Sequence, residues 1–285
     1  MSADVYCRAA LNYTGDSSAT HEGAFPPITP IEVDILDGRL GAKGFSWSTQ
    51  GFELMQHESV VADWGDAKQV AEVYVPEMEA LARTITSCDF ALSTPPLHRT
   101  PENRSNPIFA PVIIVHSDYS REYREMVTDP THPYMKLMRA SMRRRDVGFD
   151  DIGAARRIVS LHFWRNIGPR SMDYPMCFCD SRTVEEDELY PLLIESYTEG
   201  YAGPEQISFK TTMCRASDAV ARHRWYTFPE MSPDEILVFQ SYDTDAIERG
   251  EPYWSVHSAF RDPTKPADVA PRESIEMRVL CGFAG

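Results

Sequence analysis

The chain has 285 residues, 42% of them hydrophobic, which is enough for a packed core in one large domain or two small ones. Its formal net charge of −15 disfavours binding to nucleic acid or to anionic lipid, because both present negative phosphates. No apolar run is long enough to span a membrane, and the first residues lack the basic start and apolar stretch of a signal peptide, so we expect a cytoplasmic protein.

The first third of the chain predicts little regular structure before one helix. Residues 1–65 are rich in turn signals, and we expect irregular chain there with short strands. Residues 66–88 place apolar side chains at helical spacing, which predicts one amphipathic helix or two helices that meet at Pro76. Prolines at 95, 96 and 101 then interrupt the chain.

The middle of the chain predicts a strand followed by a helix. The apolar stretch from 107 to 118 indicates the strand, and the helix is expected around 134–145, ending near Gly148. Its methionines suit either a flexible lid over an apolar substrate or an ordinary core stripe. Its basic end, Arg143 to Arg145, is typical of a solvated helix terminus.

The remainder reads as many short strands separated by turns. They are expected within residues 155–167, 175–180, 206–214, 223–231, 235–243, 253–260 and 274–283, with a long loop over 191–206. Several of them alternate apolar and polar residues, as half-buried strands do. The pattern predicts a mainly β fold with flanking helices, in a closed or double-sheet architecture such as a jelly roll.

The stretch PVIIVHSDYS carries the first candidate site. His116 and Asp118 are two residues apart, so on a strand their side chains share a face and can hold two corners of a metal site. On this motif alone, a structural histidine with a hydrogen-bonded aspartate at a strand end is the somewhat better interpretation. The six scattered cysteines offer no zinc site, and we expect them to be reduced.

A later segment supplies a third corner. His257 lies near the end of a predicted strand, and Arg272 and Ser274 share a face at the start of the next, which we expect to run antiparallel to it. Two histidines and one carboxylate form the facial triad of non-haem Fe(II) oxygenases, with open positions for a bidentate 2-oxo acid and for O2. A buried arginine can bind the far carboxylate of such an acid through two charged hydrogen bonds.

With these residues the chain resembles the Fe(II)/2-oxoglutarate-dependent oxygenases. More narrowly, it resembles the fungal and bacterial hydroxylase/desaturase family that includes the cephamycin methoxylation component and the endoperoxide-forming dioxygenases of meroterpenoid pathways. The likeness is carried by GFELMQHESVVADW, AEVYVPEMEAL, VHSDYS, HFWRNIG, MCFCDSRTV, HRWYTFPEMSPDEILVFQSYD and HSAFRDPTKPADVAPRESIEMRVL. The last segment is the most specific.

The resemblance implies a double-stranded β-helix (jelly roll, cupin-like) core in a single oxygenase domain. Residues 106–285 would form the core with lids near 121–150 and 181–205, and residues 1–105 an N-terminal extension whose helix packs on it. It also implies that His116, Asp118 and His257 bind Fe(II), and that Arg272 and Ser274 hold 2-oxoglutarate. The expected reaction couples decarboxylation of that co-substrate by O2 to oxidation of a small, largely apolar secondary metabolite, with hydroxylation, desaturation, rearrangement and endoperoxide formation all open as outcomes.

Two other functions fit the same residues. One is a jelly-roll metalloenzyme that does not use 2-oxoglutarate, such as a zinc hydrolase with the same three ligands. The other is a non-catalytic β-sandwich binding protein in which His116 and Asp118 are structural. Arg165 could also face the site, although a structural role is more usual for a strand arginine, and His162 reads as an ordinary core or surface histidine. A homodimer is an open oligomeric state, and no macromolecular partner is expected.

Overall fold

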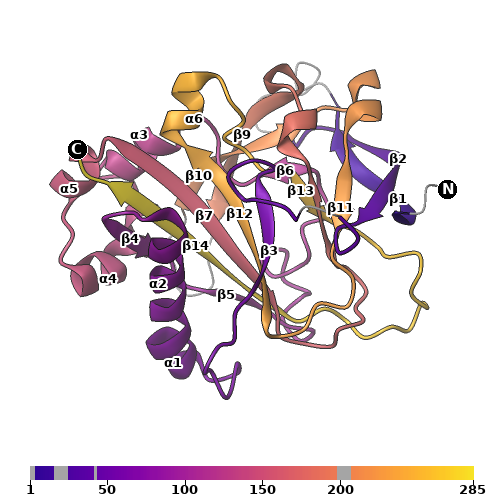
Figure 1. Cartoon of the computed structure of the whole chain (residues 1–285), viewed down its shortest axis with the longest axis horizontal. Coiled ribbons are helices and arrows are strands. Elements are labelled where there is room, and N and C mark those ends of the chain that lie inside the picture. Colours follow the sequence, from indigo (N-terminus) through magenta and orange to yellow (C-terminus); the bar gives the residue numbers. More distant parts are fainter. Residues whose placement is uncertain (1–3, 16–24, 42–43, 198–206) are drawn as a thin grey trace.

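A computed structural model gives the fold and describes residues 4–15, 25–41, 44–197 and 207–285. It is mainly β, with two sheets (Figure 1). The eight-stranded sheet contains, in spatial order, β1 (Val5–Thr14), β2 (Ile28–Asp37), β11 (Trp225–Thr227), β8 (Met176–Cys179), β13 (His257–Ala259), β6 (His116–Ser117), β10 (Ile207–Cys214) and β9 (Leu189–Tyr197). The six-stranded sheet contains β3 (Phe52–Gln56), β12 (Glu235–Asp243), β7 (Arg157–Asn166), β14 (Ser274–Phe283) and β4 (Phe90–Ser93), with β5 (Leu97–Arg99) also paired to β14.

The helices gather on one side of the six-stranded sheet and at its end (Figure 1). They are α1 (Ala67–Gln69), a π-helical segment (Val70–Tyr74), α2 (Val75–Thr86), α3 (Tyr123–Thr128), α4 (Met135–Arg145), α5 (Phe149–Ala154) and α6 (Thr244–Arg249). Short 3-10 turns follow β8 at Ser181–Thr183 and Glu186–Glu188 and precede β11 at Asp218–Arg222. Among the described residues, no helix combines the length and the apolar character that crossing a bilayer requires.

The predicted helix over 66–88 is confirmed as one continuous helical run. Asp66 caps its start by accepting hydrogen bonds from the backbone N–H groups of Lys68 and Gln69. Pro76 has no N–H to donate, and the turn before it widens into the π-helical segment instead of breaking. The run ends at Ser87, whose left-handed backbone has φ of 58°.

Three expectations for the first two thirds of the chain are wrong. Residues 1–65 contain the ten-residue strands β1 and β2, whose antiparallel pairing is a long-range effect that local turn signals conceal. The stretch 107–118 is largely irregular, and only His116–Ser117 and a bridge at Ile114 pair with neighbours. The expected loop over 191–206 is strand β9 up to Tyr197, and residues 198–206 lie outside the described residues.

The late strands agree closely with the expected ones, and β12 and β14 have the expected bounds. One relationship between them differs. We expected the strands of His257 and Arg272 to be antiparallel neighbours, yet β13 belongs to the eight-stranded sheet and β14 to the six-stranded one. Residues of the two strands therefore meet across the interior and not along a ladder.

Strand β14 separates two environments by simple alternation. Ile275, Met277 and Val279 point toward the helices and pack in a core with Val75 and Met78 of α2. Glu276 and Arg278 point the other way, into the space between the sheets. The strand thus presents a buried apolar face and a charged face on which Arg278 is buried and Glu276 partly buried.

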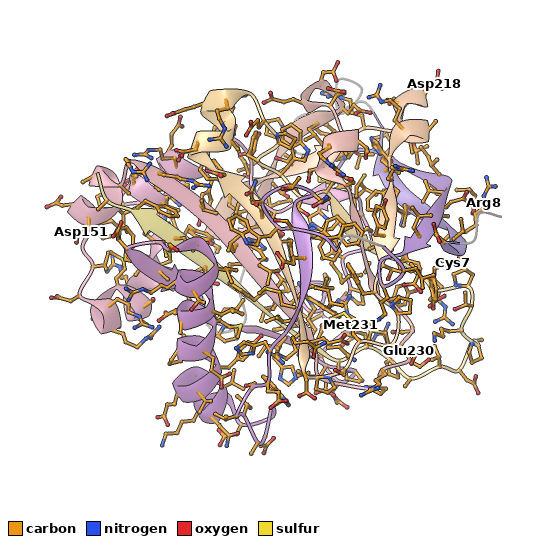
Figure 2. The ribbon with its side chains drawn as sticks, viewed as in Figure 1. Cys7, Arg8, Asp151, Asp218, Glu230 and Met231 are labelled. Carbon is orange, nitrogen blue, oxygen red and sulfur yellow. The ribbon has the colours of Figure 1, made fainter. Side chains whose placement is uncertain are left out.

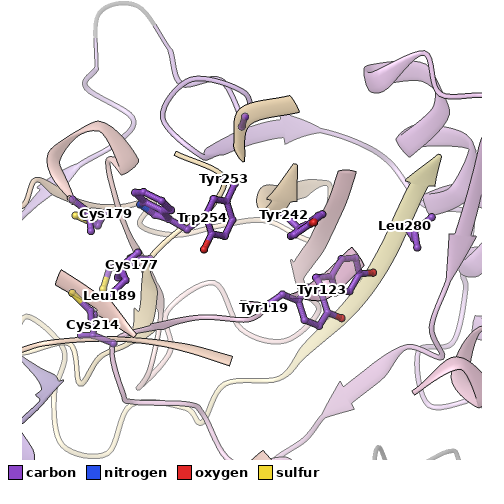
Figure 3. Close-up of a cluster of buried hydrophobic side chains, with 14 of the residues drawn as sticks. Tyr119, Tyr123, Cys177, Cys179, Leu189, Cys214, Tyr242, Tyr253, Trp254 and Leu280 are labelled. Atoms are coloured by element: carbon purple, nitrogen blue, oxygen red, sulfur yellow. The ribbon is translucent and has the colours of Figure 1, made fainter. Parts of the chain in front are cut away.

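A second core lies within the eight-stranded sheet and the adjoining helices. Figure 3 shows its aromatic and sulfur-containing side chains, including Tyr119, Tyr123, Cys177, Cys179 and Trp254. The chain surface is charged by contrast: on β1, Cys7 is buried while its neighbour Arg8 extends outward at the edge of the molecule (Figure 2).

The methionine-rich helix α4 is a core helix. Met135 and Met138 are fully buried, and no residue of 121–150 lines the cavity described below. Its basic end is tied to α2 through Glu79, a fully buried carboxylate that accepts hydrogen bonds from Ser93, Ser141, Arg144 and Arg145. The cluster formed by Glu79 and these four residues joins α2, β4 and α4.

Candidate metal centre

Two histidines from neighbouring strands face each other in the eight-stranded sheet. His257 of β13 lies directly opposite His116 of β6, and their ring centroids are 4.4 Å apart. The Nδ1 atom of each ring lies against a backbone carbonyl, Ile114 O at 2.7 Å and Ser255 O at 2.9 Å. Since a carbonyl only accepts, each Nδ1 carries a hydrogen, which leaves Nε2 as the atom of each ring that can bind a metal.

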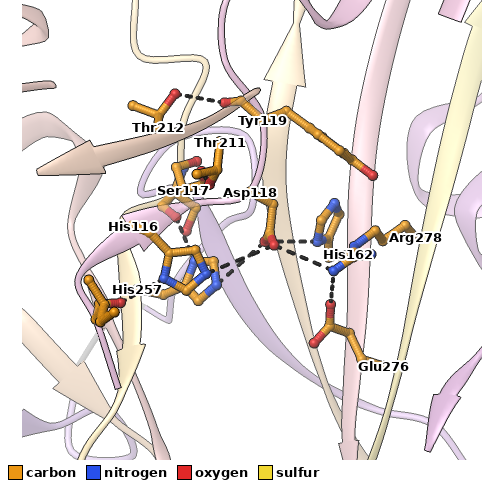
Figure 4. Close-up of polar contacts among 12 residues, drawn as sticks. His116, Ser117, Asp118, Tyr119, His162, Thr211, Thr212, His257, Glu276 and Arg278 are labelled. Atoms are coloured by element: carbon orange, nitrogen blue, oxygen red, sulfur yellow. Dashed lines mark hydrogen bonds and ion pairs between the residues drawn. The ribbon is translucent and has the colours of Figure 1, made fainter. Parts of the chain in front are cut away.

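Asp118 completes the group from just beyond the end of β6. Its Oδ1 lies 4.0 Å from His116 Nε2, and its Oδ2 lies 3.4 Å from His257 Nε2 (Figure 4). One ligand atom from each of the three residues falls within 4.8 Å of the others. The sequence-predicted triad therefore lies together, although the strand expected around His116 is only two residues long.

The electrostatics suit a cation. Burial, followed by the neighbouring His257, lowers the pKa of His116 to about 4, so this ring is neutral at pH 7. Burial works to raise the pKa of Asp118, but His162, His257 and Arg278 outweigh it and hold that pKa well below its ordinary value. An ionised carboxylate and neutral imidazoles are the protonation states in which these side chains bind metal.

A second group, Asp118, His162 and Glu276, also brings ligand atoms together. Here the cation is already supplied by the protein. The NH2 group of Arg278 lies 3.2 Å from Glu276 Oε1 and 3.7 Å from Asp118 Oδ1 (Figure 4). This group therefore suits a supporting role around Asp118 better than a second metal site.

Arg272 lies across the interior from the triad and is buried, with 5% of its surface exposed. Its NH1 group donates to Tyr174 O at 3.1 Å, and its guanidinium stacks over the Trp164 ring at 5.7 Å. In the described part of the chain no carboxylate lies within ion-pair distance of this guanidinium. Burial, followed by repulsion from Arg99, lowers the pKa of Arg272 to about 9. A buried cation in this state is a prepared site for an anion.

Ser274 is also fully buried, and its hydroxyl has no hydrogen-bond partner among the described residues. It begins β14, opposite Arg99 of β5 and Asn166 of β7. Unlike Arg272, it does not line the cavity next to the triad.

That cavity has a volume of about 170 Å³ and two kinds of wall. Its charged end contains the triad together with Arg99, Arg272, Glu276 and Arg278. Its other walls are mostly apolar and comprise Phe25, Pro107, Ile108, Val112, Ile114, Trp164, Met176, Ile194, Phe209 and Met213, with Thr211 among them. An anion would bind at the first end and an apolar molecule against the second.

Sequence reasoning did not select Arg99, His162, Glu276 or Arg278. The signal for two of them was present in β14, where Glu276 and Arg278 continue the alternation that Arg272 and Ser274 begin, within an otherwise apolar strand. Arg165, by contrast, points away from the site and binds His57 and the carbonyl of Pro233, which confirms the structural alternative.

Comparisons with known proteins agree with this arrangement. The family model of an oxidoreductase/YMDC permease-like domain matches residues 8–282. A Fe(II)/2-oxoglutarate-dependent dioxygenase of Aspergillus novofumigatus, NvfI, is 28% identical over 262 residues, covering 88% of this chain and 83% of the relative. A hydroxylase/desaturase of Hormonema carpetanum is 29% identical over 266 residues, covering 87% of this chain and 82% of the relative. A solved structure of an iron and alpha-ketoglutarate-dependent endoperoxidase, NvfI, superposes with a TM-score of 0.77 at 20% identity over 100% of both chains.

Proposed function

Because the chain belongs to the hydroxylase/desaturase family of Fe(II)/2-oxoglutarate-dependent dioxygenases, we propose that His116, Asp118 and His257 bind its Fe(II) and that Arg272 and Ser274 hold the 2-oxoglutarate. The observation that carries the proposal is the convergence of two imidazole Nε2 atoms and one carboxylate on the wall of a cavity that also contains a buried arginine without an ion-pair partner among the described residues. A zinc hydrolase or a non-catalytic binding protein would have no use for that arginine.

We further propose that the two sheets form the double-stranded β-helix core of one oxygenase domain spanning residues 1–285. Strands of the first 105 residues support this, since β3 pairs with β12, and β4 and β5 pair with β14. The helix of that segment packs on the outer face of β14. We also propose a cytoplasmic location, which the six unpaired, buried cysteines support.

Each residue of the site has a definite task in this reaction. Bound Fe(II) and 2-oxoglutarate supply the oxidising chemistry, consuming O2 and releasing succinate and CO2. The imidazoles and Asp118 hold the metal, and the carbonyls of Ile114 and Ser255 fix the orientation of the two rings. Arg272 binds the far carboxylate of the co-substrate, and stacking on Trp164 keeps the guanidinium in place. The apolar walls exclude water and orient the substrate.

The proposed substrate is a small, largely apolar secondary metabolite. The support is the apolar lining around Ile194, Phe209 and Met213, in which few polar groups could recognise a hydrophilic molecule. The hydroxyl of Thr211 is itself engaged with the carbonyl of Ser117. Hydroxylation, desaturation, rearrangement and endoperoxide formation all begin by oxidation of a C–H bond held against such walls.

An anaerobic titration with Fe(II) and 2-oxoglutarate tests the proposal. A weak visible charge-transfer band is expected for the unaltered protein, because the co-substrate chelates the metal. His257→Ala should abolish the band, and Arg272→Ala should shift the 2-oxoglutarate midpoint to roughly 10–100-fold higher concentration, the loss of about 1.5–3 kcal/mol from a charged hydrogen bond. Arg215→Ala is the matched control, since Arg215 and Ser217 repeat the R-x-S spacing but Arg215 binds the carbonyls of Asp187 and Leu189. A protein that binds Fe(II) but never shows the band is not a 2-oxoglutarate oxygenase.

A further inference from the structure

His162 is a buried histidine next to the candidate metal ligands but outside their set. It lies on the central strand β7, opposite Phe239 of β12 and Arg278 of β14, and is fully buried. An apolar side chain would fill this position at lower desolvation cost, because a buried imidazole must find partners for its nitrogens. A polar residue at such a position therefore calls for a specific contact.

The contact is with Asp118. His162 Nδ1 lies 3.0 Å from Asp118 Oδ2, on the side of the carboxylate away from His116 and His257 (Figure 4). The N–H is out of line for a well-formed hydrogen bond, and neither ring nitrogen has another hydrogen-bond partner among the described residues. Rotation about the bonds of the Asp118 side chain changes this angle without a change in the backbone.

The imidazole itself is held by its surroundings. Its ring centroid lies 5.1 Å from that of Phe239, and 5.3 Å from that of Tyr119 in an edge-to-face arrangement. Arg278 approaches the other oxygen of Asp118 at 3.7 Å. The carboxylate is thus flanked by two donors from the six-stranded sheet, while the histidines opposite it come from the eight-stranded sheet.

We propose that His162 is a positioning residue for the metal-binding carboxylate: its Nδ1–H holds Oδ2 of Asp118 and fixes the plane in which that carboxylate meets the metal between His116 and His257. The inference rests on the proposed function, since it takes Asp118 to be a metal ligand. Groups that hydrogen-bond to a metal ligand raise metal affinity typically 10–100-fold by keeping the ligand in its binding orientation.

Titration of the metal-free full-length protein with Co(II) tests this, because the visible absorption and heat of binding report on the site without turnover. His162→Leu should raise the Co(II) dissociation constant about 10–100-fold. His162→Asn should stay within about threefold of the unaltered protein, because the Asn side-chain nitrogen occupies nearly the place of Nδ1. His162→Gln, whose amide is one methylene further out, should bind Co(II) about tenfold more weakly than the unaltered protein. His98→Gln is the control, a histidine paired with Glu273 at 3.1 Å and not on the cavity wall.

The outcomes separate the alternatives. If His162→Leu, or His162→Gln should the former not fold, binds Co(II) as tightly as the unaltered protein, the positioning role is wrong. If His162→Asn loses as much affinity as His162→Leu, a donor at the place of Nδ1 does not replace the imidazole and the proposal is equally overturned. An unaltered protein that binds no Co(II) would overturn the proposed function as well. Thermal melts of the metal-free variants, which should resemble one another, show whether folding accounts for any difference.

Discussion

The buried hydroxyl of Ser274 makes no hydrogen bond to any of the described residues. Replacing it by alanine should leave the free energy of unfolding of the metal-free protein unchanged to within about 0.5 kcal/mol, because no hydrogen bond is lost. The affinity for 2-oxoglutarate in the Fe(II) complex should fall about 10-fold, which corresponds to one hydrogen bond from a hydroxyl to a charged carboxylate. Denaturant unfolding and a 2-oxoglutarate titration measure the two effects.

Ser241→Ala is the matched control for this prediction. Its hydroxyl is also fully buried and unpaired among the described residues, but Ser241 lies on β12, whereas Ser274 lies on β14 two residues after Arg272. Ser241→Ala should change neither the free energy of unfolding nor the affinity for 2-oxoglutarate. Equal affinities for Ser274→Ala and the unaltered protein would remove Ser274 from the co-substrate site.

At the level of single residues, the sequence was most informative where short-range spacing carries the chemistry. The H-x-D spacing and the distant His257 identify three side chains that the fold does bring within ligand distance. A residue that acts by holding another residue in place has no characteristic spacing to it in the sequence. His162 reaches Asp118 only because β7 and β6 belong to sheets that face each other, and this relationship depends on the whole topology.

The contact between α2 and α4 depends on Glu79. Glu79→Ala should lower the free energy of unfolding by about 3 kcal/mol at pH 7, since it leaves Arg144, Arg145 and two hydroxyls without their shared acceptor. Urea unfolding measures the change. Glu72→Ala, on the exposed side of the same helical run with a 3.8 Å contact to Lys68, should have little effect.

The same carboxylate predicts a pH dependence. Burial works to raise the pKa of Glu79, but Ser141, Ser93 and Arg144 outweigh it and lower that pKa below 4.5. As the pH falls, Glu79 is therefore protonated in the unfolded state before it is protonated in the folded state. The stability that ionised Glu79 contributes is complete above about pH 4.5 and decreases as the pH falls through the pKa of the folded state. The stability difference between the unaltered protein and Glu79→Gln should accordingly narrow below about pH 4.5. A difference that widens on acidification would contradict this assignment.

Gly51 sets the position of β3 next to the 3-10 turn that follows β8. Its φ is +92°, and a Cβ there would lie 2.2 Å from Ser181 Oγ and 3.2 Å from Trp254 O. Gly51→Ala should therefore cost about 2–4 kcal/mol, combining backbone strain with disruption of the Ser181 hydrogen bonds. Gly250→Ala, with φ of +66° and open space around it, should cost only about 1 kcal/mol of strain. Thermal or denaturant unfolding of both variants separates crowding from strain.

Elements defined by their own periodicity were predictable, and those defined by partners were not. The helix from 67 to 86 and strands β12 and β14 follow from helical spacing or long apolar runs. Strands β1, β2 and β9 have less distinctive sequences and become strands by pairing with distant segments. The segment before His116 shows the opposite case. Its composition is typical of a strand, yet it is irregular because no neighbouring strand pairs along its length.

For the molecule as a whole, the site joins the two sheets. The histidines belong to the eight-stranded sheet, whereas Arg272 leads into β14 of the six-stranded sheet. Co(II) with 2-oxoglutarate should raise the melting temperature more than Co(II) alone, because a second ligand that binds only the folded protein adds its own stabilisation. Bound at 100 times its dissociation constant, a ligand adds about 2.7 kcal/mol to stability.

Arg272→Ala distinguishes the two contributions. It should retain the shift caused by Co(II) and lose most of the additional shift caused by 2-oxoglutarate, and a chelator should reverse both. Differential scanning calorimetry provides the measurement. An additional shift that persists in Arg272→Ala would place the co-substrate elsewhere.

The cavity wall formed by Ile108 and Val112 has a consequence for how such an enzyme could diversify. This stretch lies outside the named strands, so its side chains can be exchanged with little effect on the ladders that position His116 and His257. Mutational libraries confined to it should yield mostly well-folded proteins that still load iron, while their preferences among candidate metabolites drift. A lineage could in this way acquire new products while inheriting an unaltered reaction centre.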